Sequence, residues 1–252
     1  MMTYQDACFA IEICRIVFAA VCGGLVLFAA KAVYMRLPAH WLCDFDEQPW
    51  EMHMPGFRGR KCRWFYAAFE VALMISFYRI CTGSCESGTG FMIAAARLTA
   101  GGITAACAAV IALSDRDYMI VPDQLVIVMG ICSIVMSLAS SCGDAVFAGN
   151  LQACLRASFG EIIYGAFWGA ALMLSVSAMG IITGKGSAAG FGDIKLMAVC
   201  GAVVGERVYI MYVLMVMMSG IYFSYCVVRG KVRSGEGLPL APWICSAMLL
   251  CM

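Results

Sequence analysis

Residues 208–228 read VYIMYVLMVMMSGIYFSYCVV and lie between Arg207 and Arg229 without a single charged side chain. A helix of about 20 apolar residues is long enough to cross the hydrocarbon core of a lipid bilayer. The apolar residues are continuous and do not alternate with polar ones, as they would in a strand of a membrane β-barrel. The segment therefore predicts a transmembrane helix.

The rest of the chain repeats this pattern. Apolar residues make up 63% of its 252 residues and charged residues only 13%, whereas a soluble domain carries about 25% charged residues. Besides the run at 207–229, apolar runs lie at 8–35, 64–82, 92–113, 124–141, 160–183, 194–205 and 238–252. We therefore predict an all-α, polytopic membrane protein with about eight transmembrane helices, two of them short.

The net charge and the cysteines exclude several kinds of function. A net charge of +1 provides no field that would attract nucleic acid, so no nucleic-acid partner is predicted. The 15 cysteines lie mostly inside apolar runs and form no C-x-x-C pair, so neither a zinc ribbon nor a thioredoxin-like motif is predicted.

The first basic residue, Arg15, follows Asp6 and Glu12, which is not how a cleaved signal peptide begins. The first apolar run is therefore expected to remain in the mature protein.

The basic residues predict which loops face the cytoplasm. They gather after the first, third, fifth and seventh runs, at Arg36, Arg58, Arg60, Lys61, Arg63, Arg116, Lys185, Lys195, Arg229, Lys231 and Arg233. By the positive-inside rule these loops are cytoplasmic, and both ends of the chain lie outside, in a multi-pass protein of the cytoplasmic (inner) cell membrane. This assignment requires the short run at 194–205 to cross the membrane.

Two aspartates are candidates for a catalytic pair. Asp115 follows the third run in the stretch SDRDY (114–118), and Asp193 ends the tetrad GFGD (190–193). Two predicted crossings separate them, and an even number of crossings returns the chain to the same face. We therefore expect both carboxylates at the cytoplasmic edge of the membrane, although they are 78 positions apart (193 − 115).

A pair of aspartates in this position could perform acid–base chemistry without a cofactor. Two converging carboxylates can share one proton, so that the ionised one activates a water molecule and the protonated one polarises a carbonyl group. Gly190 and Gly192 could supply positive φ angles or let a substrate approach closely. The alternative is that both aspartates are solvated or capping groups, and that the short G-x-G-D tetrad arose by chance.

The residues around both aspartates resemble the type IV prepilin peptidases, a family of membrane aspartic proteases with a G-x-G-D motif. The stretch GFGDIKLM (190–197) is similar to the family's G-x-G-D-x-K block. Asp115, with a Pro-Asp pair that begins seven residues later at Pro122, is similar to its first catalytic block. The stretch LPLAP (238–242) resembles its Pro-aromatic-small-Pro segment, with Leu in place of the aromatic residue. The resemblance implies an aspartic endopeptidase with Asp115 and Asp193 as its catalytic residues and no cofactor.

The N-terminal third is similar to the longer, bacterial form of this family, in RLP at 36–38 and in CR at 62–63. We therefore divide the chain into N-terminal helices at 1–90, which include a polar loop at 36–63, and a peptidase core at 91–252.

The same loop departs from the family in its cysteines. The longer members carry two C-x-x-C pairs there, which are linked to zinc and to N-methylation of the trimmed pilin. Only Cys43 and Cys62 remain in this chain. No metal site is predicted, and these cysteines with His40 or His53 are the weak candidates for one. The loss puts N-methyltransferase activity in doubt and leaves the peptidase prediction unchanged.

Other polar residues could support the pair or bind the substrate. Glu70 is an ionisable residue within an apolar run, which suggests a function unless it only pairs with Arg63 or Lys195. Lys195 could stabilise the ionised form of one aspartate, or could simply anchor the cytoplasmic edge. Acidic residues at 44–51, with Asp117 and Asp123, match in charge the basic leader peptide of a prepilin.

The predicted function is cleavage of prepilin-like or pseudopilin substrates at the cytoplasmic face, in type IV pilus assembly or type II secretion. Presenilin-like proteases also use G-x-G-D, but with Tyr-Asp and Pro-Ala-Leu signals where this chain has Ser-Asp and Pro-Leu-Ala. A proton-coupled transporter would place its acids at mid-membrane and often has internal repeats, which are not evident here. A non-catalytic membrane protein of a pilus or secretion assembly would retain the same aspartates and remains open.

Overall fold

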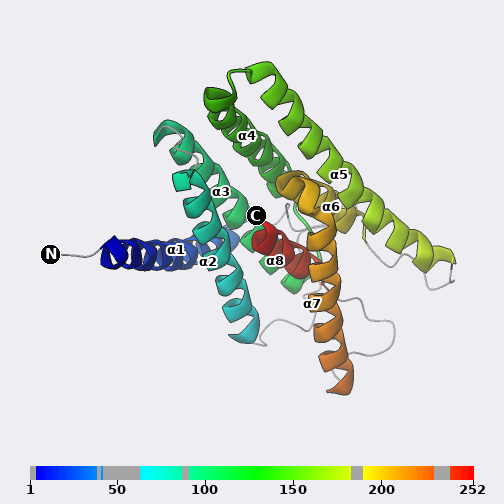
Figure 1. Cartoon of the computed structure of the whole chain (residues 1–252). Helices are drawn as coiled ribbons and strands as arrows, with labels where there is room; N and C mark the ends of the chain where they lie inside the picture. The colour runs from blue at the N-terminus through cyan, green and yellow to red at the C-terminus, as the bar shows by residue number, and fades with distance from the viewer. Residues whose placement is uncertain (1–3, 39–40, 42–62, 87–90, 183–189, 230–238) are drawn as a thin grey trace.

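The computed structural model describes residues 4–38, 41, 63–86, 91–182, 190–229 and 239–252. The regular elements of this part are helices (Figure 1): α1 Tyr4–Tyr34, α2 Arg63–Glu86, α3 Phe91–Tyr118, α4 Asp123–Ala148, α5 Leu151–Ile182, α6 Phe191–Val204, the short 3-10 helix η2 Gly205–Arg207, α7 Val208–Val228 and α8 Ala241–Cys251. The predicted all-α fold class is therefore confirmed over the described residues.

The eight predicted apolar runs correspond to the eight α-helices, and the differences lie at their ends. Asp115 was predicted to follow the third helix. α3 continues to Tyr118, however, so Asp115 lies inside this helix. α5 begins at Leu151, nine residues before the predicted run, because Asn150 caps it. The Oδ1 atom of Asn150 accepts a hydrogen bond from the Ala153 N–H at 3.2 Å, which satisfies one of the unpaired donors of the first turn.

Five stretches of the described chain are long and apolar enough to cross a membrane. They are Ile11–Tyr34, Met92–Tyr118, Asp123–Cys142, Leu151–Ile182 and Phe191–Val228, the last of which combines α6, η2 and α7. α8 has 11 residues and a length of only about 16 Å. The helices thus agree with a multi-pass membrane protein, whereas eight separate crossings remain a prediction.

Helix α3 lies at the centre of the fold and packs against α1, α2, α4 and α8. Its inward face carries small residues such as Ala108 and Ala109, which are at most 1% exposed. Small side chains let neighbouring helices approach closely where lipid provides no hydrophobic driving force between them. The outward faces of other helices expose large apolar side chains such as Phe28, Ile163 and Ile221, as expected of a surface in contact with lipid.

Helices α5 and α6 pack closely against each other at glycine residues. Gly165 and Gly169 lie one turn apart on α5, as Gly201 and Gly205 do at the end of α6. A Cβ atom on Gly165 would lie 2.7 Å from the carbonyl carbon of Gly201, and one on Gly169 would overlap the carbonyl oxygen of Met197. Two G-x-x-x-G stripes thus bring the backbones of the two helices into contact and fix α6 against α5.

The chain changes direction between α6 and α7 at Gly205. Its φ of 59° and ψ of −126° are accessible essentially only to glycine. α6 has 14 residues and is about 21 Å long, which is less than the thickness of about 30 Å of a bilayer core. The crossing predicted for 194–205 is therefore not established by α6 alone.

Candidate active site

Asp115 lies in the last turn of α3 and is only 5% exposed. The chain leaves this helix through Met119, whose φ of 57° lies in the left-handed region that is uncommon for a residue other than glycine. The hydroxyl of Ser114 donates a hydrogen bond to the carbonyl of Ile120 at 2.8 Å and so holds the same turn. The residues around Asp115 thus fix the position at which α3 ends and the chain changes direction.

Asp193 is the third residue of α6, in the first turn of that helix. Its Oδ2 atom accepts a hydrogen bond from the N–H of Gly190 at 3.2 Å. A carboxylate is favoured at this position because the first N–H groups of a helix have no partner within it, and the helix dipole is positive there. Asp193 is partly exposed, whereas Asp115 is buried.

The structure brings the two aspartates together beside α8. The charge of Asp193 acts on the carboxyl group of Asp115, and Cys245 of α8 lies close enough to interact with both charges. Cys245 lies near Cys200 of α6, and both cysteines are 0% exposed. Buried residues of α6 and α8 therefore lie near the aspartate pair.

Gly192 allows the two aspartate-bearing segments to approach each other. A Cβ atom at this position would lie 3.2 Å from the Cβ of Val121, which belongs to the turn after α3. The predicted use of the tetrad glycines for positive φ angles is wrong, because Gly190 has a φ of −70° and Gly192 lies within α6. The described glycines with positive φ are Gly149 and Gly205.

The start of α8 belongs to the stretch LPLAP (238–242), for which sequence reasoning gave a family resemblance but missed a role at the site. The backbone N–H of Ala241 donates a hydrogen bond to Oδ2 of Asp115 at 2.9 Å, in a buried position. Pro239 and Pro242 flank this residue, and a proline in the first turn is a sequence signal for a helix start. No sequence signal connects that start with an aspartate 126 positions away.

Lys195 has a different partner from those predicted for it. Its ammonium group contacts both carboxylate oxygens of Asp123, at 2.8 and 3.0 Å, and lies 4.7 Å from the centre of the Phe191 ring. Residues two positions apart on a helix point to different sides, so Lys195 faces away from Asp193. The predicted pairings of Lys195 with Glu70 and with a catalytic aspartate are therefore corrected.

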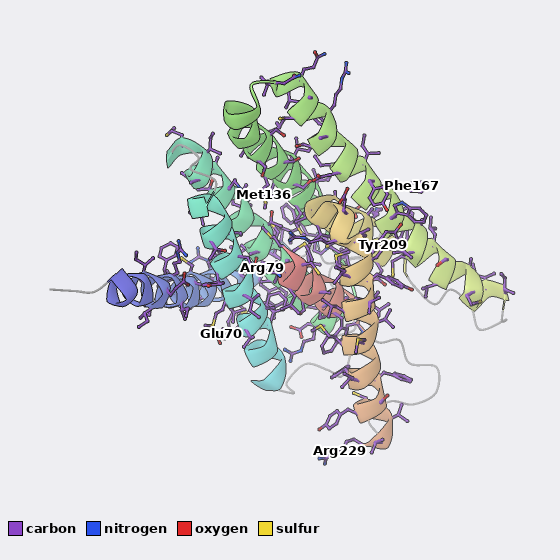
Figure 2. The ribbon with its side chains drawn as sticks, in the orientation of Figure 1. Glu70, Arg79, Met136, Phe167, Tyr209 and Arg229 are labelled. Carbon is purple, nitrogen blue, oxygen red and sulfur yellow. The ribbon has the colours of Figure 1, made fainter. Side chains whose placement is uncertain are left out.

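The other predicted support residues have surroundings of their own. Glu70 is exposed on α2 (Figure 2) and lines a groove beside Lys31 of α1. Pro122 is buried directly before α4, where its carbonyl accepts the first hydrogen bonds of that helix. Asp117 accepts a hydrogen bond from the hydroxyl of Tyr34 at 2.9 Å, which links the ends of α1 and α3.

No group of three or more potential metal ligands occurs in the part of the chain that the structure describes. The weak metal candidates Cys43 and Cys62 lie outside that part, as do His40, His53 and the acidic residues at 44–51. The metal-binding and substrate-binding roles considered for this loop therefore remain predictions.

The fold and the site define a multi-pass, all-helical membrane protein that gathers two aspartates from distant helices beside a buried short helix. Residues 102–225, just under half of the chain, match the model described as the type IV leader peptidase family. The predicted family is thereby confirmed over these residues, and the match supports a protease. No curated protein and no solved structure matches the chain. The matched region includes both aspartates and ends before α8.

The ion pair of Lys195 supplies a first testable prediction. We expect Lys195→Gln to lower the free energy of unfolding by less than about 1 kcal/mol, because both partners are at least 38% exposed and solvent screens their attraction. Asp123→Asn should have the same effect, and the double variant should be no less stable than either single one. The proteolytic activity of Lys195→Gln should stay within about threefold of wild type. A larger loss would show that Lys195 acts on the aspartate pair after all.

Proposed function

We propose that the protein is a membrane aspartic endopeptidase that removes the basic leader peptide from type IV prepilin-like substrates at the cytoplasmic face of the inner membrane. The observation that carries the proposal is the convergence of Asp115 and Asp193, from α3 and α6, within the region that matches a leader peptidase family. The proposal assigns peptide hydrolysis to these two carboxyl groups.

The chemistry that we propose needs one ionised and one protonated carboxyl group. Two like charges that interact in a partly buried site resist joint ionisation, so the pair can hold one proton between them. The ionised carboxylate takes a proton from water, the water oxygen adds to the peptide carbonyl carbon, and the protonated carboxyl group donates its hydrogen bond to the carbonyl oxygen. A proton then passes to the peptide nitrogen, and the carbon–nitrogen bond breaks.

The proposed substrate has a short basic leader followed by an apolar helix. An apolar helix can lie in the same bilayer as the exposed apolar faces of this protein. The basic leader would remain at the edge of the membrane, where Asp117 and the acids at 44–51 offer complementary charge. Asp123 has the same charge but pairs with Lys195, and Asp117 likewise contacts Tyr34 and Arg116, so a leader would have to compete with these partners.

A cleavage assay in membranes tests this function. A prepilin whose leader is basic and ends in Gly would be co-expressed with the protein, and the new N-terminus would be read by mass spectrometry. We expect one cut at the end of the leader and no added methyl group. A leader with its Lys and Arg residues replaced by Gln should be cut about tenfold more slowly, because it loses its electrostatic attraction. If the folded protein cuts no prepilin-like substrate, the non-catalytic assembly function replaces the proposal.

A further inference from the structure

Helix α8 is more deeply buried than its short length suggests. The buried residues include Ala241, Pro242, Ile244, Cys245, Ser246, Ala247, Met248, Leu249 and Cys251. Figure 1 shows α8 in the middle of the molecule, and it packs against α2, α3, α6 and α7. It lies beyond the residues that match the family model, so its role follows from its own contacts.

The N-terminal end of α8 holds the Asp115 carboxylate. The N–H of Ala241 is one of the first four of this helix, which have no acceptor within it. It donates to Oδ2 of Asp115 at 2.9 Å, and the positive end of the helix dipole favours a negative charge at that point. Cys245, one turn further along α8, lies near the same aspartate and is 0% exposed.

The C-terminal end of α8 is held by two arginines from other elements. Arg79 of α2 donates to the carbonyl of Leu250 at 2.7 Å, and Nη1 of Arg207 in η2 donates to the carbonyl of Cys251 at 3.1 Å. Figure 2 shows Arg79 on the side of α2 that lies beside α8. Guanidinium groups at this end satisfy unpaired carbonyls and match the negative end of the helix dipole. Opposite charges therefore fix α8 at its two ends.

We propose that α8 is a positioning helix for the catalytic Asp115, with Arg79 and Arg207 as positioning residues that hold its far end. The N–H of Ala241 binds one carboxylate oxygen and so sets the direction of the other oxygen. The proposal rests on the proposed function, since it explains how one of the two reacting carboxyl groups keeps its orientation.

Replacing the backbone N–H of Ala241 by an ester oxygen tests the donor itself. The hydroxy-acid analogue of alanine keeps the methyl side chain and can be introduced by nonsense suppression during cell-free synthesis into nanodiscs. We expect kcat per folded molecule to fall about tenfold to hundredfold, as for the loss of a hydrogen bond to a charged group, with KM within twofold of wild type. The matched control is an ester at Trp243, whose N–H donates to the carbonyl of the N-cap residue Leu240 at 3.0 Å. Equal losses at both positions, or wild-type kcat for the Ala241 ester, would overturn the proposal.

The arginines are tested by substitution and conservative rescue. Arg79→Gln and Arg207→Gln should each lower kcat about twofold to tenfold with little change in KM, and Arg79→Lys should recover most of the loss because it restores a cationic donor. A purely structural role would reduce the yield of folded protein without changing kcat per folded molecule. Unchanged kcat in the double glutamine variant would remove both arginines from the proposal.

A measurement that does not depend on cleavage separates this proposal from the proposed function. In protein labelled with ¹⁵N-alanine, the Ala241 amide resonance, assigned through Ala241→Gly, should move upfield in Asp115→Asn because the charged acceptor is lost. The absence of any change would overturn the positioning role even in an active protease. A clear shift in a protein that cuts no prepilin would support the contact and reject only the proposed function.

Discussion

Asp115→Asn and Asp193→Asn are each expected to abolish leader cleavage, with kcat lowered at least about a thousandfold. Asparagine has nearly the shape of aspartate and can still accept the hydrogen bonds from Ala241 and Gly190. It cannot take a proton from water or return one to the peptide nitrogen. The loss should therefore appear in kcat, measured by the rate at which the trimmed pilin forms in membranes.

Stability distinguishes this result from a structural effect. The two aspartates interact as like charges in a partly buried site, so neutralising one should leave the free energy of unfolding unchanged or raise it. Aspartates that only cap a helix or are solvated would give normal cleavage and little change in stability, because asparagine caps a helix about as well as aspartate. Glu206→Gln serves as the control, because this exposed acid lies in η2, at the other end of α6 from Asp193. It should cut at the wild-type rate.

That Asp115 and Asp193 lie near each other could be predicted from the sequence, because the prediction depends on few variables. Counting apolar runs between Asp115 and Asp193, and noting where Lys and Arg gather, is enough to put both on one face. The helix ends were less predictable, since they depend on local caps. Asn150 begins α5 nine residues before the apolar run, and α3 extends past the run to include Asp115.

The partners of individual side chains could not be predicted, because they depend on how each helix is rotated about its axis. Lys195 was expected near Asp193 or Glu70, but the packing of α6 against α4 directs it to Asp123. The donor to Asp115 is a backbone N–H, which every residue except proline carries, so sequence alone cannot single out Ala241. Hydropathy and charge determine topology, whereas contacts between helices determine the site.

Gly165→Ala should have the largest effect on stability, because the α5–α6 contact leaves no room for a methyl group. A Cβ atom there would overlap the carbonyl of Gly201, and Gly201→Ala would overlap the carbonyl of Gly165 in turn. Both obstacles are backbone atoms, so the helices themselves must separate, at a cost of about 3 kcal/mol.

Separation of these helices should also reduce activity, because α6 carries Asp193 in its first turn. Gly160→Ala is the matched control on the same helix, since a Cβ atom at Gly160 meets nothing within 4 Å. It should leave stability unchanged or raise it by up to about 1 kcal/mol through better helix propensity. Reversible unfolding in mixed micelles measures both variants. Wild-type stability in Gly165→Ala would mean that α5 and α6 do not pack backbone to backbone, and that another contact holds Asp193 near Asp115.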